Sequence, residues 1–332
     1  MPARRRPLLR DVAAAAGVST GLASYALNGR PGVAPETRAR ILATAEALGY
    51  EVNPQARSLR TGRSSTVALA LRSLQNPYFI DVIAGAQEAA FERGMSVLVV
   101  DSADSVERER RHVQRLAAFN ADGLGICPVR NREAIDVWRM LRPDSPVVAL
   151  NALAPAGDGL VRVSADRRQA VTLATRHLAE LGHRRIGFLS PLASVVPDHE
   201  RRDIFLEVAP TFDVEPVVVE TRMTAASTFE AVRGLLRRPG HPAALIANSD
   251  FAAHAVYEAA RACGVAVGTE LSVVGQDDLP TSRLLAPALT TIRLDRRGIG
   301  RAVVERLAAP ELGDHRAAVQ LVVRASSGPP PG

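Results

Sequence analysis

Six residues near the amino terminus could make direct contact with a nucleic acid. At helical spacing they would share one exposed face and the turn after it, and they are Thr20, Gly21, Ser24, Tyr25, Asn28 and Arg30. Hydroxyl, amide and guanidinium groups read base edges and phosphates in the major groove. Gly21 has no side chain to contribute, and Tyr25 cannot make the two-pronged guanine contact of an arginine. The competing interpretation is the solvated face of a small helical bundle.

Two short helices joined by a tight turn would position these residues. Gly17 can adopt the left-handed conformation that ends the first helix, and Ser19 is a good N-cap for the second. The apolar residues that recur at helical spacing on the first helix are Leu9, Val12, Ala13 and Ala16. The expected inner face of the second helix consists of Leu22, Ala26 and Leu27.

A third helix is predicted to begin at Pro35 and to end before Gly49. Ala34 precedes it and has no side-chain oxygen, which should cost about 1 kcal/mol of helix stability relative to a serine cap. The expected buried stripe consists of Ile41, Leu42, Ala45 and Leu48.

The distribution of charge supports contact between this end of the chain and a polyanion. The formal net charge of the 332-residue chain is +6, and all of it resides in residues 1–63. The remainder is neutral. A basic segment beside a neutral one is typical of a protein that meets nucleic acid at one end.

A second contact with DNA is expected between residues 53 and 62. Asn53 would cap a short helix that Gly62 would end. Two turns are too short to be stable alone in water, so we expect this helix to form only when something holds it. Leu59 beside Arg60 suits an apolar wedge driven into a minor-groove base step. A flexible basic linker is an equally good interpretation.

From Thr66 onward the pattern is that of an α/β protein. Short apolar strands alternate with amphipathic helices, which predicts parallel sheets with helices on both faces, arranged as two doubly wound lobes. The expected strands are 67–71, 97–100, 123–127, 147–150, 185–189, 216–219, 243–247 and 271–274, and the clearest helices are 79–93, 106–119 and 167–181.

Several motifs in a fixed order resemble the lactose repressor (LacI/GalR) family of bacterial transcription regulators. In the basic end they are Asp11-Val-Ala, Gly17-Val-Ser19, Leu27-Asn28, Val33-Ala-Pro-Glu-Thr-Arg38, Leu48-Gly-Tyr50 and Asn53-Pro through Gly62. In the α/β part they are Asn76-Pro-Tyr-Phe79, Ala121-Asp-Gly-Leu-Gly125, Ala179 through Gly187, Leu271-Ser-Val-Val-Gly275, Pro287 through Ile292 and Leu321 through Ser326. The resemblance covers nearly the whole chain.

The resemblance implies an all-α helix-turn-helix head over residues 1–63, with a hinge helix at 53–62 whose DNA contacts are Ala56, Leu59 and Arg60. It implies a two-lobed doubly wound domain over 64–332, similar to periplasmic sugar-binding proteins. The first lobe would comprise about 64–162 and 294–320, and the second about 163–292 and 321–328. The chain would cross between lobes near 161–166, 290–295 and 319–324.

The same resemblance assigns an effector site between the lobes. Its candidates are Tyr78, Phe79, Asn151, Arg201, Asn248 and Asp277. Carboxylate, amide and guanidinium groups with an aromatic ring suit a ligand with several hydroxyl groups, such as a sugar. For Asn151 and Phe79 a role in the core or at an interface is nearly as good an interpretation.

We therefore expect a homodimeric, cytoplasmic repressor that binds a palindromic double-stranded DNA operator and a small-molecule effector. The sequence offers no phosphate loop, metal-ligand spacing or catalytic constellation, so we expect no cofactor, no metal, no enzymatic activity and no membrane span. The alternative is a sugar-binding protein of a transport system, which would need an export signal and no DNA-binding head.

Overall fold

The computed structural model describes residues 7–50, 63–130, 132–151, 159–192, 199–222 and 224–331. The chain separates into two compact units, Met1–Ser64 and Ser65–Gly332. The expected hinge segment at 53–62 lies outside the described residues, together with its candidate contacts Ala56, Leu59 and Arg60.

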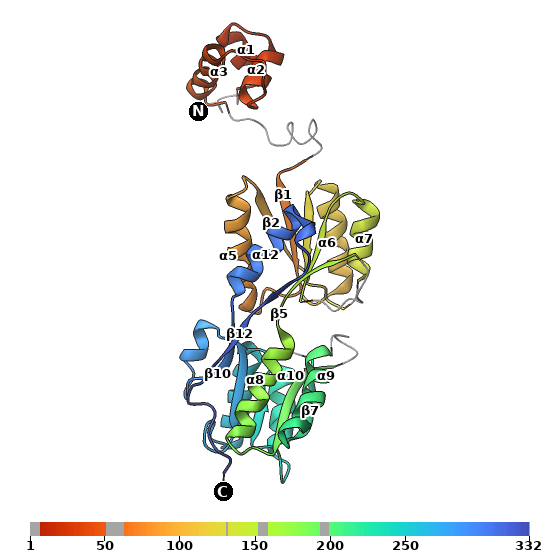
Figure 1. Ribbon diagram of the computed structural model, residues 1–332, viewed down its shortest axis with the longest axis vertical. Coiled ribbons are helices and arrows are strands. Elements are labelled where there is room, and N and C mark those ends of the chain that lie inside the picture. The colour runs from red at the N-terminus through yellow and green to blue at the C-terminus, as the bar shows by residue number, and fades with distance from the viewer. Residues whose placement is uncertain are drawn as a thin grey trace. The chain divides into compact units, whose positions relative to one another are not determined.

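Three helices make up the first unit, and they are α1 (Leu9–Ala16), α2 (Thr20–Leu27) and α3 (Pro35–Leu48) (Figure 1). Gly17 ends α1 in the left-handed conformation, with φ of 64°. The Ser19 hydroxyl accepts a hydrogen bond from the backbone N–H of Leu22 at 3.2 Å and so caps α2. No side chain caps α3 at Ala34, as expected. These local signals produce the predicted helix-turn-helix.

The core of this unit is smaller than the sequence suggests. It consists of Val12, Ala13, Ala16, Ala23, Ala26, Ile41 and Ala45. On α2, Ala23 is buried and Leu22 is only half-buried, so the expectation for Leu22 is wrong. Leu42 and Leu48 of α3 are 45% and 41% exposed, so the predicted stripe of α3 is also wrong at those positions. Leu42 follows the fully buried Ile41 and therefore points about 100° away from it around the helix, and Leu48 is the last residue of α3.

The second unit contains two six-stranded sheets, one in each lobe. In the first sheet all neighbours are parallel, and the order is β11-β5-β4-β3-β1-β2. Its strands are β1 (Thr66–Leu71), β2 (Ser96–Asp101), β3 (Gly123–Ile126), β4 (Val147–Leu150), β5 (Val161–Ala165) and β11 (His315–Ala317). Helices α5 (Tyr78–Phe91) and α12 (Arg296–Ala308) cover one face, and α6 (Val106–Ala118) and α7 (Glu133–Leu141) cover the other (Figure 1).

The second sheet has the order β12-β10-β9-β8-β6-β7, with only β12 antiparallel to its neighbour. Its strands are β6 (Arg185–Pro191), β7 (Glu215–Thr221), β8 (Ala244–Ile246), β9 (Ser272–Asp277), β10 (Thr290–Leu294) and β12 (Val319–Val322). Its helices are α8 (Arg167–Glu180), α9 (Glu200–Val208), α10 (Ala225–Leu236) and α11 (Asp250–Cys263). Short 3₁₀ turns lie at Ala209–Phe212, Pro280–Arg283 and Pro310–Leu312.

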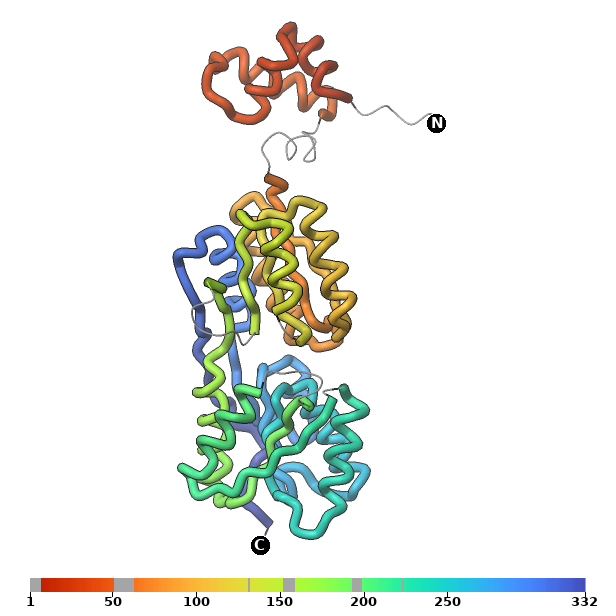
Figure 2. Tube along the Cα trace, turned by 90° about the vertical axis from the view of Figure 1, so that its right-hand side faces the viewer, coloured from red at the N-terminus to blue at the C-terminus, as the bar shows by residue number. Residues whose placement is uncertain are grey.

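The chain passes between the two lobes three times along one side (Figure 2). The passages follow β5, β10 and β11, which places them at residues 165–167, 294–296 and 317–319. Because the strands within each lobe are parallel apart from β12, the carboxyl ends of β4, β8 and β9 all reach the junction between the lobes. Within the described residues, no helix is long and apolar enough to span a membrane.

Candidate functional site

The exposed face of α2 carries the side chains that were expected to contact DNA. Thr20, Gly21 and Tyr25 are exposed, and Ser24 is half-buried. The Arg30 guanidinium lies over the Tyr25 ring, 5.4 Å from its centroid, so the two residues form one cationic and aromatic surface. Asn28 instead donates from its amide to the carbonyl of Ser24 at 2.6 Å, which closes the end of α2.

Arg38, which the sequence did not single out as a site residue, fixes this surface from α3. Its guanidinium donates to the carbonyl of Ala26 at 2.9 Å and also to the carbonyl of Arg30. The Ala26 carbonyl lies in the last turn of α2, and the Arg30 carbonyl lies in the turn that follows the helix. Arg38 therefore holds the turn after α2, and with it the position of Arg30, against the third helix.

In the larger unit, three of the expected effector residues come from the first lobe, and Tyr78 contacts both of the others, Phe79 and Asn151. Asn151 follows β4, and its side-chain amide donates to the Tyr78 hydroxyl at 2.9 Å. The rings of Tyr78 and Phe79 pack edge to face with centroids 5.1 Å apart, and both residues are 6% exposed. Burial raises the pKa of Tyr78 above its ordinary value, against the effect of the Asn151 hydrogen bond. Phe79 belongs to the hydrophobic core.

Three further effector candidates come from the second lobe. Arg201, in the first turn of α9, donates to the carbonyl of Asn248 at 2.8 Å. Asp277 ends β9 with φ of 118°, a backbone conformation that residues other than glycine rarely adopt. It is 4% exposed, and among the described residues its Oδ2 atom has no hydrogen-bond partner.

The electrostatic effects of these residues on one another's pKa values indicate that they share one neighbourhood. Burial raises the pKa of Asp277 well above its ordinary value, Asp250 raises it further, and the guanidinium groups of Arg201 and Arg296 lower it. The charge of Asp277 also raises the pKa of Tyr78 in the other lobe. Residues from both sides of the junction thus lie close enough to affect one another's ionisation.

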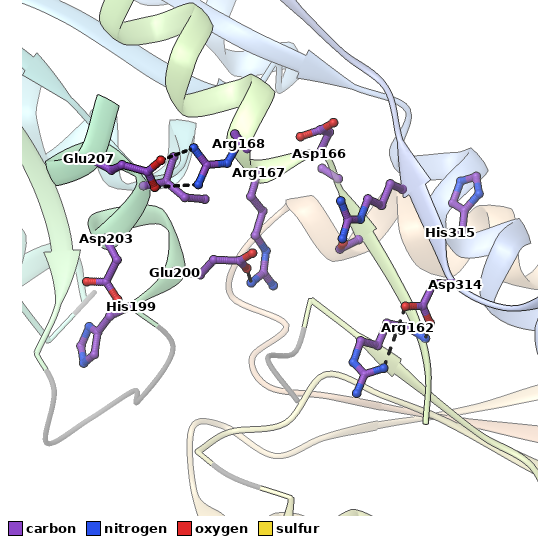
Figure 3. Close-up of a pocket in the computed structure, with 14 residues that line it drawn as sticks. Arg162, Asp166, Arg167, Arg168, His199, Glu200, Asp203, Glu207, Asp314 and His315 are labelled. Atoms are coloured by element: carbon purple, nitrogen blue, oxygen red, sulfur yellow. Dashed lines mark hydrogen bonds and ion pairs between the residues drawn. The ribbon is translucent and has the colours of Figure 1, made fainter. Parts of the chain in front are cut away.

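A cavity of about 680 Å³ lies beside the segments that join the lobes (Figure 3). Arg162 on β5 and Asp314, directly before β11, line it from the first lobe, and Arg168 and Glu207 line it from α8 and α9. Arg168 and Glu207 form a two-pronged pair at 2.9 and 2.7 Å, and the backbone N–H of Arg162 donates to Asp314 at 2.8 Å. None of the six effector candidates lines this cavity.

Trp138 and His183, whose residue types could also serve a ligand site, have structural surroundings. Trp138 is fully buried between α7 and the first sheet. His183 is 2% exposed, and its Nε2 atom lies 3.0 Å from both the Ser272 hydroxyl and the Gly328 carbonyl, so it joins the carboxyl-terminal segment to the second sheet. Within the described residues, no group of three metal-ligating side chains is assembled.

Comparison with known proteins agrees with both units. Residues 8–53 match the family of bacterial regulatory proteins called lacI, and residues 175–327 match a periplasmic binding protein-like domain. The HTH-type transcriptional repressor PurR of Photobacterium profundum is 26% identical over 303 residues, which are 90% of each protein. PurR of Serratia proteamaculans is 28% identical over 296 residues, which are 88% of this chain and 86% of the relative.

Solved structures of related regulators have the same arrangement of head and effector domain. The Lac repressor dimer bound to operator and the anti-inducer ONPF has a TM-score of 0.86 at 27% identity, with 98% of this chain and 100% of that chain covered. The complex of the transcriptional regulator CelR with cellobiose has a TM-score of 0.71 at 26% identity, with 97% and 100% covered. The chain therefore carries a LacI-family helix-turn-helix domain and a periplasmic-binding-protein-like domain, and it is a DNA-binding transcriptional repressor with an effector domain.

Proposed function

We propose that this repressor acts as a homodimer on a palindromic operator and that its effector is a small molecule with several hydroxyl groups, such as a sugar. The single observation that carries the effector proposal is the buried Oδ2 atom of Asp277, which has no partner among the described residues. A buried carboxylate oxygen is costly unless it accepts hydrogen bonds, and ligand hydroxyls would supply them.

The surroundings of Asp277 support the same chemistry. Tyr78 and Asn151 offer hydroxyl and amide groups from the first lobe, and Arg201 and Asn248 offer a guanidinium and an amide from the second. These groups both donate and accept hydrogen bonds, as a polyhydroxylated ligand requires. The solved complex of CelR with cellobiose is one related regulator with a sugar bound. We assign the ligand to this neighbourhood and not to the ion-paired cavity of Figure 3.

For the operator, we assign base contacts to Thr20, Ser24 and Tyr25, and phosphate contacts to Arg30. In a helix-turn-helix the amino-terminal residues of the second helix reach base edges in the major groove. Gly21 allows close approach of the backbone, and we keep Asn28, Ala56, Leu59 and Arg60 as contacts made once the head and the hinge are seated on DNA. A hinge that folds only on the operator would then add specificity.

Exposed apolar side chains support the homodimer. Ile80 on α5 is 64% exposed, and Leu98 on the edge strand β2 beside it is 38% exposed. Leu284 in the second lobe is 81% exposed. Large apolar side chains that are exposed in a single chain are candidates for burial in an interface. Light scattering should show a dimer for the parent protein and a monomer for the Ile80→Asp, Leu284→Asp variant.

A thermal-shift screen tests the effector proposal, because a ligand that binds the folded state stabilises it by mass action. The probes are cellobiose, lactose, D-ribose, D-glucose and, as non-sugar controls, adenine and guanine. We expect at least one sugar to raise the melting temperature of the parent protein and to leave the Asp277→Asn variant unchanged. Stabilisation by a purine base alone would overturn the sugar assignment, and stabilisation of both proteins by the same sugar would overturn the role of Asp277.

A mobility-shift titration with the DNA upstream of the chain's own gene tests the operator proposal. Leu59→Ala should weaken binding to this DNA more than binding to a random duplex of equal length, because a wedge acts at one base step. An equal loss on both duplexes would show that the segment around Leu59 is a basic linker.

The transport alternative is not favoured. The PurR relatives are transcriptional repressors and match about nine-tenths of this chain, and the family match to the head covers residues 8–53.

A further inference from the structure

A single arginine bridges the two lobes beside the proposed effector site. Arg296 is the first residue of α12 in the first lobe, and its side chain is only 10% exposed. Its Nε and Nη2 atoms donate to the Asp81 carboxylate at 3.0 and 2.6 Å. Its Nη1 atom donates to the backbone carbonyl of Asp277, at the end of β9 in the second lobe. One guanidinium is therefore shared between an acid of one lobe and the main chain of the other.

The carbonyl that accepts this hydrogen bond belongs to Asp277, a residue with an unusual backbone conformation. Asp277 has φ of 118° and Asp278 has φ of 51°, and both values lie in the region that residues other than glycine rarely adopt. Such a conformation persists only when surrounding contacts hold it. Asp278 is held within its own lobe by Arg293 and Arg324. The hydrogen bond from Arg296 to Asp277 comes from the opposite lobe.

The other end of the bridge leads to the remaining effector candidates. Asp81 and Tyr78 share the first turn of α5, and the Tyr78 hydroxyl accepts the hydrogen bond from Asn151. Asn151 is hydrogen-bonded to Tyr78, and one turn of α5 separates Tyr78 from Asp81. Asp81 is hydrogen-bonded to Arg296, which in turn donates to the Asp277 carbonyl. This series of contacts runs from the end of β4 in one lobe to the end of β9 in the other.

Helices α5 and α12 cannot absorb a change at this bridge by sliding past each other. A Cβ atom on Gly85 of α5 would lie 2.0 Å from the carbonyl oxygen of Arg297, and one on Gly300 of α12 would lie 1.9 Å from that of Val82. The two backbones are therefore in direct contact. A movement of Asp277 relative to the first lobe must stretch or break the Arg296 hydrogen bond or move both helices together.

We propose that Arg296 is a positioning residue that couples the arrangement of the lobes to the geometry of the effector-binding carboxylate of Asp277. While Asp81 orients it, Arg296 holds the Asp277 main chain in its unusual conformation and holds the second lobe against the first. An effector that moves the Asp277 backbone would release this hydrogen bond, and an effector that fits the present geometry would reinforce it. The role of Asp277 in this statement rests on the proposed function, whereas the bridge between lobes does not.

The neighbouring arginine provides a matched control. Arg297 also approaches Asp81, at 3.7 Å, and pairs with Glu88, but its side chain is 57% exposed and both of these acids lie on α5 of the first lobe. Replacing either arginine by methionine removes one positive charge at the start of α12. Only the change at Arg296 removes a contact with the second lobe.

The test measures the distance between the lobes in the full-length protein without any ligand. Nitroxide labels are attached to Gln114→Cys on α6 and Ala226→Cys on α10, both exposed positions, with Cys127→Ala and Cys263→Ala as background. Labelled protein is mixed with an excess of unlabelled protein so that each dimer carries one label pair. Double electron–electron resonance then gives the distribution of interlobe distances.

We expect Arg296→Met to broaden this distribution and shift its maximum by several ångströms, and Arg297→Met to leave it unchanged. Asp81→Ala should reproduce the effect of Arg296→Met, and the double variant should add nothing, because both changes break the same bridge. If the Arg296→Met variant does not fold, Asp81→Ala replaces it as the test of the bridge. An unchanged distribution in Asp81→Ala or Arg296→Met, or an equal change in Arg297→Met, would overturn the proposal. Since no effector is present, this result is independent of the outcome of the sugar screen.

Discussion

Two buried carboxyl groups in the larger unit show how burial changes acid chemistry at single residues. Asp250 is fully buried and accepts hydrogen bonds from the Thr291 hydroxyl at 2.6 Å and from the backbone N–H of Leu279 at 2.9 Å. Burial nevertheless raises its pKa to about 6. Glu109 is 1% exposed and accepts from the backbone N–H of Val129 at 2.8 Å. Burial raises its pKa to about 7.

The raised pKa of Glu109 predicts a dependence of stability on pH. The folded protein holds the proton of Glu109 up to about pH 7, whereas the unfolded chain releases it near the ordinary value of 4.5. The contribution to the free energy of unfolding is therefore complete below pH 4.5 and is lost as the pH rises to 7. At pH 8 the free energy of unfolding of Glu109→Gln should exceed that of the parent by up to about 3 kcal/mol. At pH 5 the difference in the free energy of unfolding should be smaller.

Urea unfolding at pH 5 and pH 8 measures this difference. Glu107→Gln, on the exposed face of the same helix, is the control and should show no gain at pH 8, because arginines lower the pKa of Glu107. An equal effect of Glu109→Gln at both pH values would show that Glu109 does not titrate in this range.

Tyr25 allows a prediction about DNA recognition at the same scale. It is 45% exposed, and its ring supports the Arg30 guanidinium. If Tyr25 makes the base contact we propose, Tyr25→Ala removes it and also frees Arg30, so we expect about a tenfold loss of operator affinity, equivalent to about 1.4 kcal/mol. Fluorescence anisotropy with operator and with random DNA measures both affinities. A comparable loss on random DNA would place Tyr25 on the phosphate backbone.

At the scale of elements, helices α5 and α12 of the first lobe are in direct backbone contact. The helices approach so closely that glycines stand at Gly85 and Gly300, and ion pairs between Arg301 and Glu92 and between Arg297 and Glu88 flank the contact. The bridge through Arg296 lies at the end of this pair that faces the junction. The pair is therefore suited to carry a displacement from the effector site through the first lobe as one body.

Gly85→Ala tests how closely the two helices are packed. The added methyl group would lie 2.0 Å from the carbonyl oxygen of Arg297, so the helices must separate, and we expect a loss of about 1–3 kcal/mol in the free energy of unfolding. Gly234→Ala on α10 is the control, because a Cβ there meets nothing within 4 Å. It should be neutral or stabilising by up to about 1 kcal/mol, since alanine favours the helix. Equal effects at both sites would contradict the close approach.

At the scale of the whole molecule, charge is divided between the two units. Residues 1–63 carry the entire net charge of +6, and the rest of the chain is neutral although it is rich in arginine. In the larger unit many arginines pair with acids on neighbouring helices, such as Arg168 with Glu207 and Arg301 with Glu92. Attraction to a polyanion is thus concentrated in the head.

This division predicts a steep dependence of DNA binding on salt. Each phosphate neutralised by the head releases counterions, so the logarithm of the binding constant should fall linearly with the logarithm of the salt concentration. For two heads we expect affinity to fall by about 10³-fold or more between about 50 and 200 mM salt. Anisotropy titrations with operator DNA measure the slope. Affinity that changes less than about tenfold over this range would indicate few phosphate contacts.

Local signals in the sequence were sufficient for much of the fold. Gly17, Ser19 and Pro35 mark helix ends by their own conformational preferences, and the structure confirms each of them. The strands at 147–150 and 185–189 were predicted because parallel strands buried on both faces are continuous apolar runs. Leu42 and Leu48 were misassigned because a periodic pattern shows which residues lie on one side of a helix but not how much of that side the neighbouring helices cover.

Of the effector site, the sequence predicted residue types and the structure added their partners. Asp277 and Arg201 could be named from the family resemblance, and their roles remain a proposal. Arg296 could not be named, because nothing in Asp295-Arg296-Arg297 distinguishes the arginine that crosses the junction from the one that stays on the surface. Its partner Asp81 lies 215 positions away, and no local pattern connects residues at that separation.

The sequence by itself determined the helix-turn-helix, the basic charge of the head and the alternation of strands and helices, because these depend on local conformational preference and composition. Only the tertiary structure decided which charges meet across the junction. It placed Arg296 between Asp81 and the Asp277 carbonyl and left one buried oxygen of Asp277 without a partner among the described residues. Such contacts join distant parts of the chain, and they form only when both sheets and the helices between them are packed.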